Sequence, residues 1–351
     1  MTPFHFQLQT GRARTWLLWA IVLLLGASAI VATLAWQDYR RFADAPLLLS
    51  EPRNIEFARG TPFKDIVRQL RRERITRGSP FYWRLLAREM NVSSRLHAGE
   101  YALAPGLSPR GLIDMMAAGR VVQHRFTIVE GWTFRQLRLA LAAEPGLAQT
   151  LPGLEDATIA QRLAIAGEPE GWFLPETYAW VKGDSDLLVL ERAHAAMRRT
   201  LDGLWSARAV GVPLDTPYEA LILASIIEKE SGVADERAQI AGVFARRLRI
   251  GMRLQTDPTV VYGLGDRYDG NIRRRDLDTD TPYNTYTRAG LPPTPIALPG
   301  ARAIEAALNP ADGNALYFVA LGDGSGAHAF SATLDEHNRA VARYLRRIRA
   351  R

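Results

Sequence analysis

The chain has 351 residues and a mass of 39.0 kDa, enough for about two domains. Hydrophobic residues make up 47% of it and charged residues 23%, which is ordinary for a globular protein and argues against a disordered chain, a collagen or a polytopic membrane protein. There is no cysteine, which excludes a disulfide framework, a thiol nucleophile and any cysteine-based zinc or iron–sulfur site.

The net charge of +7 is concentrated at the two ends of the chain. Residues 339–351 carry six arginines and no acid, and the first fourteen residues add Arg12 and Arg14. The body between these ends has a net charge of −1, so the sequence does not predict a nucleic-acid surface. The arginine-rich end is typical of a solvated helix end, and contact with anionic lipid head groups or wall polymers is the alternative.

One apolar stretch near the N-terminus is long enough to cross a membrane. Residues 15–37 contain no ionisable side chain, and a helix over 16–36 would be about 31 Å long, close to the hydrocarbon thickness of a bilayer. We therefore predict a transmembrane anchor over 15–37 behind a short cytoplasmic head over 1–14. A signal peptide cleaved near residues 27–29 is the alternative, although the apolar run continues past that point. Arginines on both sides leave the orientation of the span open.

The next segment, after a linker predicted over 38–50, has the pattern of a small α+β unit. The sequence predicts a strand over 54–58, a helix with Thr61 as N-cap, a second helix over 81–90 and a strand over 101–104, with Ser108 capping a further helix. This βααβ order resembles a LysM module, a small peptidoglycan-binding unit. A packing subdomain without a ligand of its own is the alternative for residues 51–122.

Residues 123–348 are predicted to form a larger, helix-rich domain with short strands. Its expected elements are a strand over 124–130, helices over 134–143, 187–207, 217–231, 235–249 and 334–348, and a β-hairpin over 316–320 and 328–332. The six histidines have no metal-ligand spacing, and the glycine-rich run over 322–326 has no P-loop lysine. The sequence therefore predicts no metal and no cofactor.

The chemistry-bearing segment is the end of the helix predicted over 217–231. After an apolar run it carries Glu228, Lys229 and Glu230, and at 100° per residue the two glutamates face opposite ways. Glu230 stacks over the more apolar neighbours and lies in the last turn, where burial and the helix dipole both raise the pKa of a carboxyl group. A raised pKa suits a general acid, and an ordinary solvated glutamate at a helix end is the alternative.

Three blocks of sequence then resemble the endolytic murein transglycosylases, which are single-anchor proteins of the bacterial inner membrane. The blocks are EKES at 228–231, RLRIGMRLQTDPTVVYGLG at 247–265 and YNTYTRAGLPPTPIALPG at 283–300. The match is dense from 170 to 345 and includes EGWFLPETY at 170–178. The resemblance implies an α+β fold with a LysM-like unit and a lysozyme-like, helix-rich catalytic domain in the periplasm.

In this family the catalytic glutamate directly precedes the small hydroxyl residue of the EKES run, which is Glu230 here. The resemblance implies that Glu230 protonates the glycosidic oxygen between N-acetylmuramic acid and N-acetylglucosamine, and then acts as base on the muramyl 6-hydroxyl. The product would be a 1,6-anhydro end in nascent peptidoglycan glycan strands, formed without water and without a second carboxylate. Peptidoglycan synthases are the implied protein partners.

The residues expected to contact the saccharide follow from their chemistry and their place in these blocks. Amides, hydroxyls, carboxylates and aromatic faces in loops suit a sugar groove. They are Gln255, Thr256, Asp257, Tyr262, Tyr283, Asn284, Thr285, Tyr286 and Glu176.

Each of these assignments has a structural alternative. Asp257 could instead be the N-cap of a helix starting at Pro258, and the tyrosines could be packing residues. Two other functions also stay open: a water-using muramidase in which Asp257 partners Glu230, and a non-catalytic peptidoglycan-binding scaffold.

Overall fold

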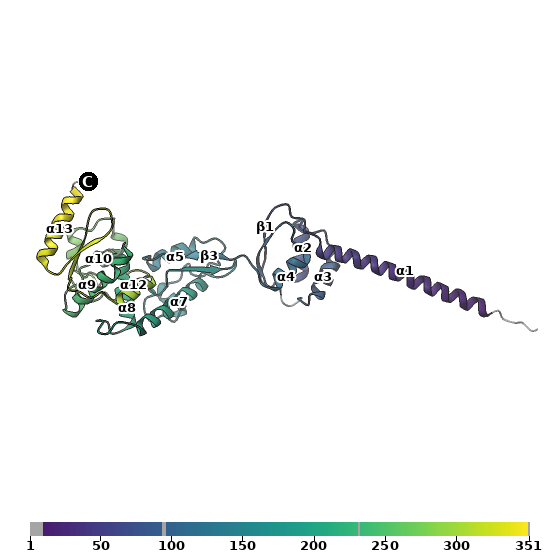
Figure 1. The fold of residues 1–351 in the computed structure, drawn as a ribbon, viewed down its shortest axis with the longest axis horizontal. Helices are drawn as coiled ribbons and strands as arrows, with labels where there is room; N and C mark the ends of the chain where they lie inside the picture. The colour runs from purple at the N-terminus through teal and green to yellow at the C-terminus, as the bar shows by residue number, and fades with distance from the viewer. Residues whose placement is uncertain (1–9, 93–95, 231, 350–351) are drawn as a thin grey trace, which may run out of the picture. The chain divides into compact units, whose positions relative to one another are not determined.

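The computed structural model describes residues 10–92, 96–230 and 232–349, and it divides into two compact units between Gln123 and His124 (Figure 1). The part predicted as a head, residues 1–14, lies largely outside the described residues. Both units mix helices with short two-stranded sheets, so the predicted helix-rich α+β class is confirmed.

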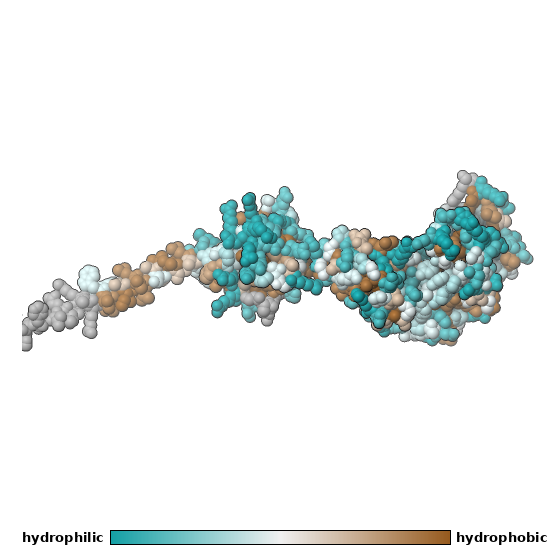
Figure 2. Space-filling model, turned by 180° about the vertical axis from the view of Figure 1, so that it is seen from behind, coloured by the Kyte–Doolittle hydropathy of each residue, from teal (hydrophilic) through white to brown (hydrophobic). Residues whose placement is uncertain are grey.

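The N-terminal helix α1 (Thr10–Asp44) contains one stretch that is apolar enough to cross a membrane. Every side chain from Trp16 to Trp36 is exposed. Figure 2 shows this part of the helix mostly in brown, the colour of hydrophobic residues, with paler residues between them. Water would oppose such an exposed apolar surface, whereas a bilayer would favour it. The structure therefore agrees with a single-pass anchor in this region.

The last turns of α1 belong to the first unit. Residues 38–50 were expected to form a linker, but residues 38–44 continue the helix, and Tyr39, Ala43 and Leu47 are buried in the core of the unit. Apolar residues four apart lie on the same helix face, which is why this face packs against α3 (Pro80–Glu89) and α4 (Pro109–Ala117).

The first unit surrounds this helix end with a two-stranded sheet and three helices. β1 and β2 pair antiparallel, with Ile55 opposite Tyr101, and the core includes Phe57, Trp83 and Tyr101. The observed order is that of the predicted βααβ pattern, and Ser108 caps the following helix as predicted. Thr61 is not the N-cap of the first helix, because Pro62 takes that position. The elements are β1 (Arg53–Phe57), α2 (Phe63–Arg72), α3 (Pro80–Glu89), β2 (Gly99–Leu103) and α4 (Pro109–Ala117).

The second unit is mostly helical, with two antiparallel strand pairs, β3–β4 and β5–β6. The hairpin β5–β6 is at the predicted place, whereas β4, α6 and α12 lie in segments for which no helix or strand was predicted. Its elements are β3 (His124–Thr127), α5 (Phe134–Ala142), α6 (Asp156–Arg162), β4 (Thr177–Trp180), α7 (Asp186–Ser206), α8 (Pro217–Glu230), α9 (Arg237–Arg249), α10 (Asp257–Leu264), α11 (Arg274–Asp278), α12 (Ala301–Leu308), β5 (Tyr317–Ala320), β6 (His328–Ser331) and α13 (Leu334–Arg349), with short 3₁₀ turns at Ala234–Glu236 and Gly265–Arg267.

Helix α8 forms the centre of the second unit. It packs against α7, α9, α10 and α12, and every residue from Ala220 to Ile227 is buried (Figure 1). A helix that is apolar all round in this way is a core helix. Its last turn is less deeply buried, and that turn carries Glu228, Lys229 and Glu230.

Candidate active site

The two glutamates at the end of α8 face different surroundings. The Glu228 side chain is only 5% exposed; it pairs with Arg237 at 3.2 Å and accepts a hydrogen bond from the Gly300 backbone N–H at 3.0 Å. All of these partners are protein groups. These contacts hold Glu228 in place. Glu230, on the opposite face of α8, is therefore the candidate for the catalytic carboxyl group.

Glu230 is half-buried and receives one hydrogen bond, from the hydroxyl of Thr256. Burial raises the pKa of the Glu230 carboxyl, and the nearby negative charge of Asp257 raises it further. The hydrogen bond from Thr256 and the positive charges of His328 and Arg247 act in the opposite direction, and burial outweighs them. A carboxyl that holds its proton above the usual pH range is suited to general acid catalysis.

Thr256 is held in place by a small hydroxyl network. It is only 2% exposed, and its backbone N–H donates to Thr285 Oγ1 at 3.0 Å. Thr285 Oγ1 lies 2.9 Å from Thr259 Oγ1, which also donates to the Thr256 carbonyl at 2.7 Å. Since its hydroxyl serves Glu230, Thr256 makes no side-chain cap although it occupies the N-cap position of α10. The network thus fixes the hydroxyl that points at the candidate acid.

We expect Thr256→Val to shift the pH dependence of activity upward. The hydrogen bond from Thr256 lowers the pKa of Glu230, so its loss raises that pKa. A general acid loses activity as pH rises through its pKa, and this alkaline limb should therefore move to higher pH in the variant. A pH–rate profile of glycan cleavage measures it; a limb that stays in place or moves to lower pH contradicts the assignment.

Two of the predicted sugar-contacting residues are buried and hydrogen-bonded within the protein. Asn284 is 1% exposed; its amide donates to three backbone carbonyls between Asp276 and Thr279, and its oxygen accepts from the Tyr286 N–H. Thr285 is 2% exposed and belongs to the network of Thr256. Their polar atoms are thus engaged inside the protein, where both residues hold the loop in shape, and a contact with the saccharide stays a prediction for them.

Asp257, Tyr286 and Gln255 are more accessible. Asp257 is exposed, and it is the first residue of α10 rather than its N-cap; it accepts a 2.6 Å hydrogen bond from the Tyr286 hydroxyl. Gln255 is exposed and has a φ of +48°, a left-handed conformation that is uncommon outside glycine. This turn places Thr256 opposite Glu230, and backbone strain of this kind gathers at functional sites.

Two further side chains near Glu230, Arg247 and His328, were not singled out from the sequence. Arg247, which is 6% exposed, donates to the carbonyls of Leu316 and Leu254 at 2.7 and 2.6 Å. The His328 ring lies 2.7 Å from Glu236. Arg247 is in the quoted block at 247–265, but its proximity to Glu230 depends on how α9 packs against α8, which no local pattern gives.

A cavity of about 720 Å³ lies between α5, α10 and the 283–294 loop. Tyr262 and Tyr283 both line it, with their rings 4.9 Å apart and edge to face. The Tyr262 hydroxyl donates to Glu170 at 3.2 Å, and the Tyr283 hydroxyl lies 2.9 Å from Thr294 Oγ1. Helix α10 connects this cavity with the residues around Glu230. Tyr262, which lines the cavity, follows Asp257 by five residues, an axial rise of about 7.5 Å.

Glu170 is a site residue that the sequence analysis missed. It is 6% exposed, it accepts hydrogen bonds from the Phe134 backbone N–H at 2.9 and 3.1 Å, and burial raises its pKa to about 7. Glu176, which was expected to bind substrate, lies six residues later in the same block, is exposed and does not line the cavity. Both glutamates fall in the block EGWFLPETY, so the sequence pointed to the correct segment. The block does not tell which of its two carboxylates faces the cavity.

The raised pKa of Glu170 predicts a pH-dependent stability. The folded protein favours the protonated carboxyl, so wild type should lose stability as pH rises from 4.5 to about 7. Glu170→Gln has no such loss, and we expect it to gain up to about 3 kcal/mol over wild type across this window. Thermal unfolding of both proteins in detergent from pH 4 to 8 measures it; parallel curves would contradict the buried, protonated state.

The arrangement defines a carboxylate site of the kind used to cleave glycosidic bonds: one shielded carboxyl at a helix end, beside a cavity lined by tyrosines. Within the described residues, no group of three or more histidine, aspartate or glutamate side chains is arranged to hold a metal ion.

The family follows from comparison with known proteins. Residues 55–343 match the model of the YceG-like family, so the chain belongs to this family. It is 32% identical to an endolytic murein transglycosylase of Bacillus subtilis over 72% of this chain and 74% of that protein. It is also 32% identical to one of Streptococcus pneumoniae over 59% of this chain, although only 36% of that longer protein is covered. The family predicted from the sequence blocks is thus confirmed.

A solved structure shows the same fold. A crystal structure of a YceG-like protein from Listeria monocytogenes aligns with a TM-score of 0.52 and 30% identity, covering 82% of this chain and 99% of the other.

Proposed function

We propose that this protein is a membrane-anchored lytic transglycosylase that cuts the β-1,4 bond between N-acetylmuramic acid and N-acetylglucosamine within peptidoglycan glycan strands. The observation that carries the proposal is Glu230: a half-buried carboxyl of raised pKa at the end of a buried helix, with Thr256 donating to it. The family's named members, endolytic murein transglycosylases, support it.

The reaction needs only one carboxyl group. Protonated Glu230 donates its proton to the glycosidic oxygen, and the bond from that oxygen to the muramyl C1 breaks. The Glu230 carboxylate then removes the proton from the muramyl 6-hydroxyl, and the freed oxygen bonds to C1, which closes the 1,6-anhydro ring. Glu230 ends as it began, protonated, and no water is consumed. The oxocarbenium-like charge develops close to Asp257, whose carboxylate is held by Tyr286.

The cavity beside α10 offers a place for neighbouring sugar units. Its volume is within the range of ligand pockets, and Tyr262 and Tyr283 provide aromatic faces of the kind on which sugar rings stack. Protonated Glu170 can donate a hydrogen bond to a hydroxyl or acetamido oxygen. We assign this cavity to the glycan strand on one side of the scissile bond.

The location follows from the substrate and the anchor. The apolar span of α1 fits a single pass through the inner membrane, and the glycan lies in the periplasm, so the units after α1 are assigned to that side. An anchored enzyme works on newly made strands near the membrane, and peptidoglycan synthases are the natural partners there.

Digestion of uncrosslinked glycan strands by the purified full-length chain tests this function. We expect strands of intermediate length that end in 1,6-anhydro-muramic acid, detected by mass spectrometry after chromatography. Products with only reducing ends would support a water-using muramidase instead. Binding without any cleavage would support a scaffold, and either result would overturn the proposal.

A further inference from the structure

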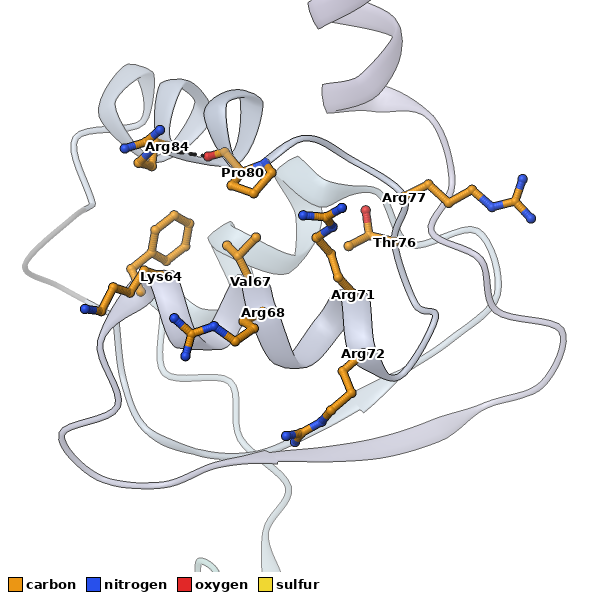
Figure 3. A pocket seen from close by; sticks show the side chains of 10 residues that line it. Lys64, Val67, Arg68, Arg71, Arg72, Thr76, Arg77, Pro80 and Arg84 are labelled. Atoms are coloured by element: carbon orange, nitrogen blue, oxygen red, sulfur yellow. Dashed lines mark hydrogen bonds between the residues drawn. The ribbon is translucent and has the colours of Figure 1, made fainter.

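The first unit contains a cavity of about 760 Å³ that the proposed catalysis does not use (Figure 3). It lies along α2 and the segment that leads into α3, and its lining includes five arginines and one lysine but no carboxylate. We call it the basic pocket. Its charged members are Lys64, Arg68, Arg71, Arg72, Arg77 and Arg84.

Four of these six cations have no partner among the described residues. Within the part of the chain that the structure describes, Lys64, Arg71, Arg72 and Arg77 make no ion pair and no side-chain hydrogen bond. Arg68 pairs with Asp65 at 2.8 Å, and Arg84 reaches only the Pro80 carbonyl at 3.4 Å. Like charges gathered around one hollow repel each other, and a bound anion relieves this repulsion. The pocket is therefore suited to a phosphate-type group.

The floor of the basic pocket is apolar. Val67, which is 2% exposed, lines it together with Phe63 of α2 and Pro80 at the start of α3, and Figure 3 shows the labelled charged side chains around Val67. A free inorganic anion gains nothing from such a floor. A ligand that joins a phosphate to an apolar portion uses both features.

The pocket lies close to the end of the apolar span. The Phe42 ring of α1 contacts Tyr82 and Trp83 of α3 with ring centroids 5.6 and 5.5 Å apart, the first pair tilted and the second edge to face, and it packs against Gly78. Phe42 follows Trp36 by six residues, which is an axial rise of about 9 Å. The polar layer of a bilayer extends roughly 5–8 Å beyond the hydrocarbon on each side, so this end of the pocket lies near the height of lipid phosphates.

Aromatic side chains mark the same level. Trp36, Tyr39 and Tyr82 form a chain of ring contacts at 5.4 and 5.8 Å, and Phe81 next to them is 60% exposed. Aromatic residues gather at membrane–water interfaces, where one end of the ring is wet and the other apolar. This belt continues from the anchor to the first residues of α3, beside the basic pocket.

We propose that the basic pocket binds the phosphate head group of an anionic phospholipid and holds the first unit against the membrane surface. The inference rests on the proposed membrane anchor and is independent of the proposed catalysis. Its ligand is recognised by two features together, the phosphate by the arginines and the glycerol and upper acyl region by the apolar floor.

Lipid retention by the purified full-length chain tests the proposal. We would count bound lipids by native mass spectrometry after adding a phosphatidylglycerol or a phosphatidylcholine of the same chain length. Wild type should retain more phosphatidylglycerol than phosphatidylcholine. In the triple variant Lys64→Gln/Arg71→Gln/Arg84→Gln, the amount of bound phosphatidylglycerol should fall at least tenfold. The matched control, Arg343→Gln/Arg346→Gln/Arg349→Gln on α13, removes the same charge from exposed positions and should retain the lipid as wild type does.

The other outcomes are decisive as well. Equal retention by both triple variants, or no preference for the anionic lipid in wild type, overturns the proposal. Displacement of the lipid by millimolar inorganic phosphate would show a site for free anions and would overturn the lipid assignment. If the triple variant unfolds on heating earlier than wild type, Lys64→Gln alone, at an exposed position, should still weaken retention. Extraction of the chain from membranes by carbonate would refute the anchor itself, and the glycan assay reports separately on catalysis.

Discussion

Glu230→Gln should lower the rate of glycan cleavage by about 1000-fold or more, while the protein stays folded. A glutamine keeps the shape of the carboxyl and can still accept the hydrogen bond from Thr256, but it has no proton to give. Because the proposed reaction uses the same group first as acid and then as base, both steps are lost together. The measurement is the rate of release of anhydro ends from glycan strands by the full-length chain.

A surface glutamate gives the matched control. Glu191 on α7 is exposed. It makes no contact with Glu230 in the described residues and does not line the cavity beside α10, so Glu191→Gln should cleave at the wild-type rate. Thermal unfolding should be the same for wild type and both variants to within a few degrees. More than a tenth of wild-type activity in Glu230→Gln would show that another group acts as the acid.

The second large effect concerns stability and the other glutamate of α8. Arg237→Met removes the cation that pairs with Glu228 and leaves a carboxylate that is only 5% exposed without its counter-charge. Breaking a buried pair from one side costs about 3–5 kcal/mol, and we expect a loss of about 3 kcal/mol in the free energy of unfolding, because the Gly300 N–H still bonds to Glu228. Denaturant unfolding near pH 8 measures it.

The pH dependence of this loss has a definite sign. Burial raises the pKa of Glu228, so below that pKa the carboxyl is protonated and no unpaired charge is buried. The deficit of Arg237→Met should therefore shrink as pH falls. The double variant Glu228→Gln/Arg237→Met should recover most of the stability at pH 8. A deficit that is the same at every pH, or that persists in the double variant, would mean that packing rather than charge is lost.

Features set by neighbours in the sequence were predictable. The helix over Pro217–Glu230, its last turn and the opposite directions of Glu228 and Glu230 all follow from the 100° step of a helix. Caps are local as well: Ser108 caps α4 as predicted, and Thr133 directly before α5 caps that helix in the same way. The anchor region is a run of apolar residues that needs no tertiary information.

Features that depend on packing were not predictable. Asn284 has the chemistry of a sugar ligand, yet it is buried because three backbone carbonyls of another segment converge on its amide. Glu170 and Glu176 look alike in the sequence, and only the approach of α5 and Tyr262 buries the first. Tyr39 and Ala43 fall in the segment predicted as a linker, and it is the fold of the first unit that makes them core residues.

The central claim is that one carboxyl group cleaves the glycan without water. Digestion of glycan strands by the full-length chain in water enriched in oxygen-18 tests it most directly, with the new ends examined by mass spectrometry. The claim predicts 1,6-anhydro ends that carry no oxygen-18, since the 6-hydroxyl of the sugar supplies the attacking oxygen. New reducing ends labelled with oxygen-18 would contradict it.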